Sequence, residues 1–327
     1  MRPPAPRYLV IALLTTLACA LSGCGHAEAN EHVVLSLDWV PNTNHTGFYV
    51  ALDKGWYAEE GLDVEIQVPS DPAAALKQVA AGNTPFGVSF QDEVTIARSN
   101  GIPVVSVAAI IQHNTSAIAS LASAGIQSAA DFEGKTYAAF GTAIERPMLQ
   151  GLMQCAGADV NRLEFVDVGY DTLPALVGGR ADLIWIFQGW DGIQAQLKGI
   201  ELNVIPFYGG CVPDYYTPVI IAGETIIAER PELVERFMRA TARGYDFAIA
   251  NPSEAADILL KHSPETDAQL AHASQEWLSA QYQADAPQWG LQKEEVWAEF
   301  ASWMADNDLL AKPIDPKAAF TNDFIPE

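Results

Sequence analysis

Aromatic, amide and imidazole side chains follow directly after apolar runs in the first half of the chain. The segment 38–47, with the sequence DWVPNTNHTG, is the densest example. Aromatic faces stack on flat rings, and amide and imidazole groups donate and accept hydrogen bonds. These residue types predict a site that holds a planar, weakly charged ring. The candidate binding residues of this half are Trp39, Asn42, His45, Gln91 and Gln112.

A second group of candidates lies between residues 141 and 217. The turn GTAIE at 141–145 leads into a predicted helix, whose first backbone N–H groups could bind an anion. The segment WIFQGWD at 185–191 extends past a predicted strand, and DYYTP at 214–218 carries two tyrosines. The candidates here are Glu145, Trp185, Gln188, Trp190, Asp191, Tyr215 and Tyr216.

Several of these residues also have a purely structural explanation. His45 could be a surface histidine whose hydrogen bonds are satisfied within the protein. Asp92, beside Gln91, could simply cap a helix, because carboxylates are favoured at helix N-termini. Trp185 and Phe187 share one face of the predicted strand, so part of this segment could belong to the core.

Composition limits the classes of function that remain. The chain has 41 Asp and Glu against 18 Lys and Arg, a formal net charge of −23. Such a surface repels phosphate backbones and excludes nucleic-acid binding. Hydrophobic residues make up 49% of the sequence, which is enough for a folded core. We find no cysteine or histidine cluster at ligand spacing and predict neither a metal nor a cofactor.

The N-terminus has the pattern of an export signal. Arg2 and Arg7 precede an apolar run that ends in Leu-Ser-Gly-Cys at Cys24. The run from 8 to 21 is shorter than the roughly 20 residues that span a membrane. The final tetrapeptide resembles a bacterial lipobox, which implies cleavage after residue 23 and lipid on Cys24. An ordinary cysteine after a conventional cleavage site is the alternative. The lipobox predicts a protein anchored by lipid to the extracytoplasmic face of the cell membrane.

Two further cysteines, Cys155 and Cys211, remain in the mature chain. In an oxidising compartment they could form one disulfide or stay as two buried thiols. The sequence leaves both possibilities open.

Apolar runs alternate with helical patterns along most of the chain, and a helical tail follows from 231 to 306. Alternation of this kind predicts an α/β fold with parallel sheets covered by helices. We expect two lobes around a cleft. The first comprises residues 33–114 and 218–327 and the second 115–217, after a signal peptide at 1–23 and a linker at 24–32. Ligands of open α/β sheets bind beyond the carboxyl ends of the strands.

Four segments carry a family resemblance: LDWVPNTNHTG at 37–47, GWYAEEGL at 55–62, GIPV at 101–104 and DFEGK at 131–135. They resemble the extracytoplasmic solute-binding proteins of ABC importers, in the branch that includes the thiamine-pyrimidine-precursor binders and the yeast pyrimidine synthase. The resemblance implies the type II periplasmic binding fold and a monomer that delivers its ligand to permease and ATPase subunits. Its pocket positions fall on Trp39, Asn42, His45, Gln91, Glu145, Gln188 and Tyr216.

The ligand that the resemblance implies is a planar N-heterocyclic vitamin. Trp185, Phe187 and Trp190 make the second lobe more aromatic than a pyrimidine requires, so riboflavin is the leading prediction and a formylaminopyrimidine the alternative. The synthase uses a lysine-bound pyridoxal phosphate, a consumed histidine and a cysteine-rich iron site. His45 lies in the segment resembling the one that carries that histidine, but clustered cysteines are absent from this sequence. We therefore predict a binding protein that is not an enzyme.

Overall fold

The computed structural model describes residue 1 and residues 29–69, 74–142, 144–169, 172–208 and 212–327. The predicted signal peptide after Met1, the predicted lipidation site Cys24 and the cysteine Cys211 lie outside these residues. Within them, no helix combines the length and the apolar character needed to cross a membrane. Strand β1 begins at Glu31, inside the stretch predicted as linker.

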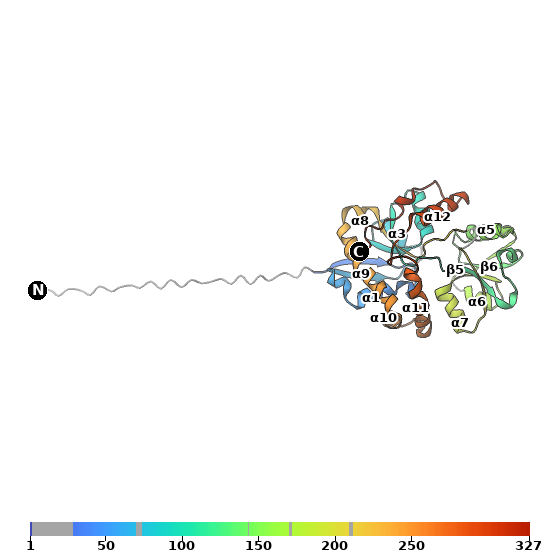
Figure 1. Ribbon diagram of the computed structural model, residues 1–327, viewed down its shortest axis with the longest axis horizontal. Helices are drawn as coiled ribbons and strands as arrows, with labels where there is room; N and C mark the ends of the chain where they lie inside the picture. Colours follow the sequence, from blue (N-terminus) through green and yellow to red (C-terminus); the bar gives the residue numbers. More distant parts are fainter. Residues whose placement is uncertain (2–28, 70–73, 143, 170–171, 209–211) are drawn as a thin grey trace.

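Two five-stranded sheets form the framework. The first has the order β2-β1-β3-β10-β4 and contains β1 (Glu31–Ser36), β2 (Leu62–Gln67), β3 (Phe86–Ser89), β4 (Val104–Ala109) and β10 (Val219–Gly223). The second has the order β7-β6-β8-β5-β9 and contains β5 (Ser116–Leu121), β6 (Thr136–Ala139), β7 (Glu164–Asp167), β8 (Leu183–Phe187) and β9 (Leu202–Pro206). Figure 1 shows them in two lobes, with β5 and β6 in the lobe farther from the N-terminus.

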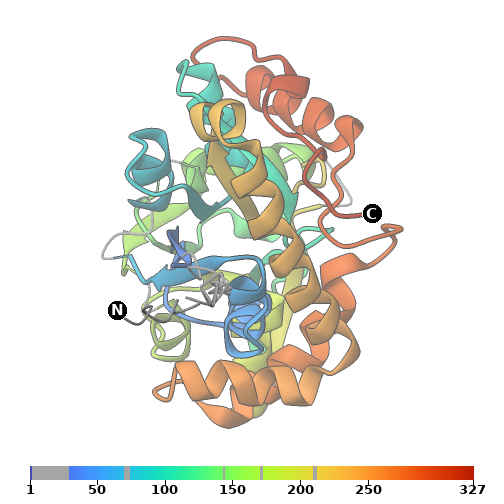
Figure 2. The same cartoon turned by 90° about the vertical axis from the view of Figure 1, so that its left-hand side faces the viewer.

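Helices surround both sheets (Figures 1 and 2). Around the first sheet lie α1 (Thr46–Asp53), α2 (Trp56–Glu59), α3 (Ala74–Ala80), α4 (Gln91–Ser99), α8 (Glu224–Glu229), α9 (Pro231–Ala250) and α10 (Pro252–His262). Around the second lie α5 (Glu145–Cys155), α6 (Thr172–Val177) and α7 (Ile193–Leu197). The last two are α11 (Ala268–Gln283) and α12 (Glu294–Asp306). Short 3-10 helices are η1 (Thr43–His45), η2 (Ala122–Ala124), η3 (Ala129–Phe132), η4 (Val160–Arg162) and η6 (Pro316–Ala318), and η5 (Gln188–Gly192) is a π-helical turn.

Both sheets are mixed, whereas the sequence predicted parallel sheets. β10 runs antiparallel to β3 and β4, and β5 runs antiparallel to β8 and β9. The chain leaves the first sheet at the carboxyl end of β4 and enters the second at the same edge. A strand that enters from this edge must run opposite to the strands that end there. The chain returns from β9 to β10 in the same way, so β10 runs antiparallel to β3 and β4.

Helix α9 shows how the sequence builds the core. Pro231 occupies its first turn, where a missing backbone N–H costs nothing. Its buried residues recur every three or four positions and include Phe237, whose ring stacks on Phe86 of β3 at 3.9 Å. Gly244 lets α9 approach α1, because a Cβ there would lie 2.0 Å from the carbonyl oxygen of Gly47.

The C-terminal helices contact both groups of elements. Leu278 and Tyr282 of α11 belong to the core of the first sheet, while α11 also contacts η5 and α7. Phe300 and Met304 of α12 are buried in the core that contains β5, β6 and β8. The sequence predicted that this whole tail belongs to the lobe of the first sheet. The hydrophobic periodicity of α12 indicates a buried face, but it cannot show that this face packs against the second sheet.

Candidate functional site

The segment 38–47 forms the connection from β1 to α1, and its imidazole is fully buried. His45 Nε2 lies 2.6 Å from Asp38 Oδ1, and His45 Nδ1 accepts a hydrogen bond from the backbone N–H of Asn42 at 3.3 Å. Because Nδ1 is an acceptor, the proton of the neutral ring is on Nε2 and points to Asp38. His45 is 0% exposed, so this histidine fixes the loop and leaves no ring nitrogen for a ligand. The hydrogen bonds of His45 are therefore satisfied within the protein, as the structural alternative predicted. The residue lies in the interior, however, and not at the surface.

The amide of Asn42 is also used within the loop. Its Oδ1 accepts from the backbone N–H of Asn44 at 2.9 Å, and its Nδ2 donates to the carbonyl of Val40 at 3.0 Å. Asn42 is thus the N-cap of η1, a role in which asparagine is favoured. Trp39, in contrast, is only partly buried, and it is the predicted contact of this loop that still has exposed surface.

Ser274 of α11 connects this loop to the second predicted segment. The Ser274 hydroxyl donates to the carbonyl of Gly189 in η5, and it lies 2.6 Å from Thr43 Oγ1. Because the serine proton is given to Gly189, the Thr43 hydroxyl must be the donor to Ser274. Two loops that are far apart in sequence are therefore joined through one buried side chain. Ser274 was not among the predicted residues, because a serine in a long amphipathic helix carries no signal.

The turn η5 presents three predicted residues beside that junction. Gln188, Trp190 and Asp191 are all partly exposed. Asp191 Oδ2 accepts from the backbone N–H of Phe187 at 2.9 Å, and burial raises the pKa of Asp191 to about 6. Single π-helical turns occur often at functional sites. Gly189 is required here, since a Cβ would lie 2.9 Å from the Trp277 ring of α11.

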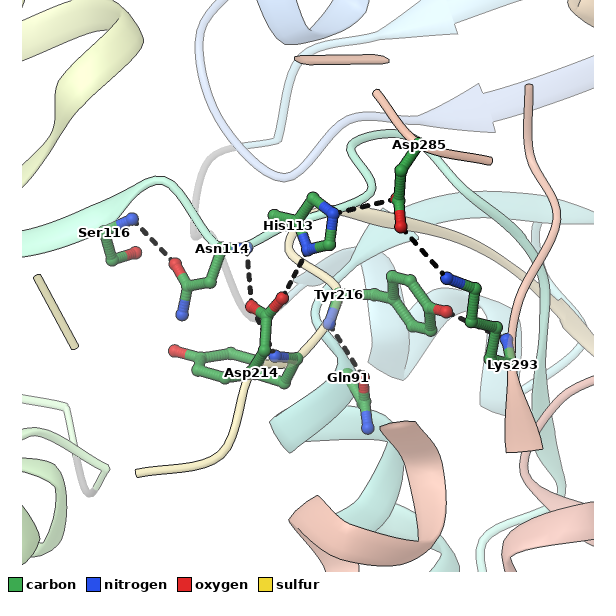
Figure 3. Close-up of polar contacts among 9 residues, drawn as sticks. Gln91, His113, Asn114, Ser116, Asp214, Tyr216, Asp285 and Lys293 are labelled. Carbon is green, nitrogen blue, oxygen red and sulfur yellow. Dashed lines mark hydrogen bonds and ion pairs between the residues drawn. The ribbon is translucent and has the colours of Figure 1, made fainter. Parts of the chain in front are cut away.

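Gln91 and Tyr216 bind each other rather than solvent (Figure 3). Gln91 Oε1 accepts from the Tyr216 backbone N–H at 2.7 Å, and Gln91 Nε2 donates to the carbonyl of Val296 at 3.3 Å. The Tyr216 hydroxyl accepts from the backbone N–H of Lys293 at 2.8 Å. Both side chains are at most 1% exposed, so they tie the returning chain to α4 and α12.

Gln112 and Glu145 also serve the fold. Gln112 Nε2 donates to the carbonyl of Leu291 at 2.9 Å. The Glu145 carboxylate accepts from the Tyr137 hydroxyl and from the backbone N–H groups of Phe140 and Thr142, each at 2.8 Å. The sequence predicted that N–H groups in this turn could bind an external anion, but the protein's own carboxylate already occupies them.

The buried aromatic candidates pack against other rings. Trp185 lies 4.2 Å from Phe207 and 6.3 Å from Phe140 between ring centroids. Tyr215 stacks on Phe300 of α12 at 4.2 Å with an interplanar angle of 14°. Both are core residues with 6% and 3% exposure, respectively. Trp39 and Trp190 are therefore the candidates best placed to offer an aromatic face to a ligand.

Ion pairs surround the point where the chain crosses between the sheets (Figure 3). His113 Nδ1 lies 2.6 Å from Asp214 Oδ2, and His113 Nε2 lies 2.9 Å from Asp285 Oδ1. Lys293 Nζ pairs with the other oxygen of Asp285 at 3.3 Å. Burial lowers the pKa of His113, but the bonds to the two aspartates outweigh it and leave the pKa raised.

Three carboxyl groups that the sequence analysis left out of the site lie at the carboxyl ends of β1 and β3. They belong to Asp38, Asp92 and Glu93. Burial raises the pKa of Asp92 to about 6, and burial, Asp92 and Asp38 together raise that of Glu93 to about 7. Ser89 donates a 2.6 Å hydrogen bond to Glu93. In the sequence, Asp92 and Glu93 form an acidic pair after an apolar run, which is a signal for a site. Capping of the following helix explains Asp92 equally well.

Cys155 is disulfide-bonded; Cys211 lies outside the described residues, and their pairing stays a prediction. The first surface cavity, of about 300 Å3, is lined by residues such as Val79, Pro103 and Ile226, and the second, of about 440 Å3, by residues such as Gly192 and Val204. Neither is lined by a predicted site residue. In the part of the chain that the structure describes, no group of three or more His, Cys, Asp or Glu could hold a metal ion.

Comparison with known proteins places this arrangement in a family. Residues 42–255 match the model of the family described as NMT1/THI5 like. The chain belongs to this family. A formylaminopyrimidine-binding protein from Halalkalibacterium halodurans is 33% identical over 322 residues, which cover 96% of this chain and 97% of the relative.

Other members differ in what their names say. The riboflavin-binding protein RibY from Chloroflexus aurantiacus is 29% identical over 320 residues, with 90% of this chain and 86% of RibY covered. A 4-amino-5-hydroxymethyl-2-methylpyrimidine phosphate synthase from Legionella pneumophila is 27% identical over 244 residues, with 73% of this chain and 76% of the synthase covered. The family thus contains proteins named for binding and proteins named for catalysis.

Solved structures confirm the predicted fold class. The periplasmic aliphatic sulphonate binding protein SsuA from Escherichia coli superposes with a TM-score of 0.65 at 15% identity. The match covers 88% of this chain and 91% of SsuA. At this identity the likeness establishes the two-lobed fold of periplasmic binding proteins and says nothing of the ligand.

Proposed function

We propose that this protein is the extracytoplasmic substrate-binding component of an ABC importer and that it binds a formylated aminopyrimidine. The observation that carries the proposal is the junction at Ser274, which joins the loop after β1 to the turn after β8. The ligand site that we propose lies at this junction. Trp39 and Trp190 supply its aromatic faces, and the carboxyls at the ends of β1 and β3 supply its polar groups.

The carboxyl groups favour an aminopyrimidine. Such a ring presents a nitrogen acceptor next to an exocyclic amine donor. A carboxyl group with a pKa of about 7, as in Glu93, is substantially protonated near neutral pH. In that state it donates through its hydroxyl and accepts through its carbonyl, and so matches both groups of the aminopyrimidine edge.

Riboflavin, the leading prediction from sequence, has less support from the geometry. Its ring edge carries two carbonyl groups around an N–H and would suit side-chain amides. The amides of Asn42, Gln91 and Gln112 are bonded within the protein, which leaves Gln188 as the partly exposed amide among the predicted site residues. Trp185, one of the aromatic residues behind that prediction, packs in the core. The match to RibY keeps riboflavin as the second candidate.

We further propose that the protein is not an enzyme. A histidine that reacted as a substrate would need an accessible ring nitrogen. His45 is fully buried and both of its nitrogens are bonded to Asp38 and Asn42. Lipid attached at Cys24 would hold this monomer at the outer face of the cell membrane, beside the permease and ATPase subunits that it supplies.

The test is titration calorimetry of the purified soluble chain with a formylaminopyrimidine and, separately, with riboflavin. We expect saturable, one-to-one binding of the formylaminopyrimidine and a raised melting temperature, since a ligand that binds only the folded state stabilises it. If only riboflavin binds, riboflavin would take the place of the formylaminopyrimidine as the ligand. Binding of neither, with no small molecule released from the protein on denaturation, would refute the proposed function.

A further inference from the structure

Two buried donors near the carboxyl end of β8 have no hydrogen-bond partner within the described residues. They are Ser116 Oγ and Trp185 Nε1, and the two side chains are 0% and 6% exposed. Asn114 lies beside them and is 1% exposed, but its side chain forms a hydrogen bond with the Tyr215 hydroxyl. Buried polar groups in native proteins almost always have a partner, because leaving one unpaired is costly. Two such groups in one region therefore call for an explanation.

The register of the second sheet brings these two donors together. Ser116 pairs with Phe187, and Ile118 pairs with Trp185. Directly opposed residues share a face of the sheet and so do alternate residues along a strand, which places Ser116 and Trp185 diagonally on one face. Asn114 is two residues earlier, and its Oδ1 accepts from the Ser116 backbone N–H at 2.7 Å (Figure 3).

This region lies at the edge of the sheet where the site is proposed. Trp185 is two residues before the end of β8, and Gln188 of η5 follows directly after that strand. The rings of Phe140 and Phe207 next to Trp185 come from the positions just after β6 and β9. An aromatic, low-dielectric surrounding strengthens any hydrogen bond that these donors make.

The charges nearby select the kind of partner. The backbone N–H of Asn114 donates to Asp214 Oδ1 at 2.9 Å. Burial raises the pKa of Tyr215 and Asp92 raises it further, while the side-chain hydrogen bond with Asn114 lowers it. An anionic ligand group would be repelled by the carboxylates of Asp92 and Asp214. An indole N–H can only donate and a serine hydroxyl can donate, so the partner is an acceptor, and the neighbouring carboxylates favour a neutral one.

We propose that Ser116 and Trp185 bind a neutral carbonyl oxygen of the ligand. In a formylated aminopyrimidine this is the formyl oxygen. The inference rests on the proposed function and extends it: the carboxyls of the first sheet bind the amine edge, and the donors of the second sheet bind the formyl group. The site accordingly prefers the formylated compound over the free amine and rejects phosphorylated pyrimidines.

The experiment compares two ligands and three variants by titration calorimetry. The ligands are a formylaminopyrimidine and the same aminopyrimidine without its formyl group. The variants are Trp185→Phe and Ser116→Ala, with Ser120→Ala as the matched control. Ser120 also has a buried hydroxyl without a partner among the described residues, but it lies near the other end of β5.

We expect Trp185→Phe and Ser116→Ala each to weaken binding of the formylated ligand by about 3- to 10-fold, the value of one neutral hydrogen bond. Binding of the unformylated ligand should stay constant, and Ser120→Ala should change neither. The melting temperature of ligand-free Ser116→Ala should stay constant or rise, because an unpaired buried hydroxyl has been removed. Trp185→Phe should lower it, since the smaller ring loses packing against Phe207.

Equal losses for both ligands, or no loss for either, would overturn the inference, since the donors would then not recognise the formyl oxygen. A lower melting temperature of ligand-free Trp185→Phe together with equal losses would assign the indole a structural role. Failure of the unmodified protein to bind either pyrimidine would instead count against the proposed ligand. If only riboflavin binds, the same variants must weaken riboflavin, whose ring also carries carbonyl oxygens, or the inference fails independently.

Discussion

Replacing Ser274 by alanine tests the junction on which the site depends. The substitution removes two buried hydrogen bonds, one from Thr43 and one to the Gly189 carbonyl. Each neutral hydrogen bond contributes about 1 kcal/mol net, and a buried carbonyl left unpaired costs a further amount of the same order. The expected destabilisation is therefore about 2–3 kcal/mol. For a protein of this size it corresponds to a melting temperature lower by roughly 4–10 °C.

A double-mutant cycle with Thr43→Val separates the two bonds. Thr43→Val removes one donor and leaves the bond from Ser274 to Gly189, so it should cost about 1 kcal/mol. Because the two hydroxyls bond each other, the coupling energy should be about 1 kcal/mol. The assay is thermal unfolding of the four proteins, followed by titration with ligand. A loss below about 0.5 kcal/mol in Ser274→Ala, or strictly additive effects, would show that the two loops are held together by something else.

Three further outcomes are expected, two from the structure and one from the sequence of the N-terminus. The raised pKa of His113 means that its ion pairs with Asp214 and Asp285 stabilise the fold fully below about pH 6.5, and that this stabilisation is lost as pH rises through the raised pKa. His113→Gln should therefore remove the corresponding fall in melting temperature between pH 6 and pH 8. An unchanged fall in the variant would contradict this assignment. Burial of Glu93 raises its pKa to about 7, so its ionisation destabilises the folded protein as pH rises from about 4.5 through 7. Glu93→Gln should then be more stable than the unmodified protein at pH 8 and no more stable at pH 4, and the opposite order would disprove the assignment. Cys24→Ser should release the full chain from membranes, and its retention in the pellet after a carbonate wash would exclude a lipid anchor at that residue.

The sequence identified the connections that follow β1 and β8. Segments 38–47 and 185–191 stood out because polar and aromatic residues follow apolar runs, and strand ends are where α/β proteins bind ligands. The lobe boundaries were predicted after residues 114 and 217, and the chain passes over between Ala109 and Ser116 and returns between Pro206 and Val219. Local patterns sufficed for these features because they depend on neighbouring residues.

The roles of individual side chains could not be predicted in the same way. Gln91 accepts from the backbone of Tyr216, 125 positions later, and no local pattern announces that pair. Glu145 lies in a turn that could bind an anion, and only the geometry shows that its own carboxylate fills it. The strand register brings the unpaired donors of Ser116 and Trp185 onto one face of the sheet, and a single sequence does not encode that register visibly. Partners that are distant in sequence decide which polar residues remain available to a ligand.

A crystal structure of the protein with a bound formylaminopyrimidine tests the central claim most directly. The account predicts the ring between Trp39 and Trp190, its amine edge at the carboxyls of Asp92 or Glu93, and its formyl oxygen within hydrogen-bond distance of Trp185 Nε1. Density for the ligand elsewhere, such as in the cavity lined by Gly192 and Val204, would contradict it.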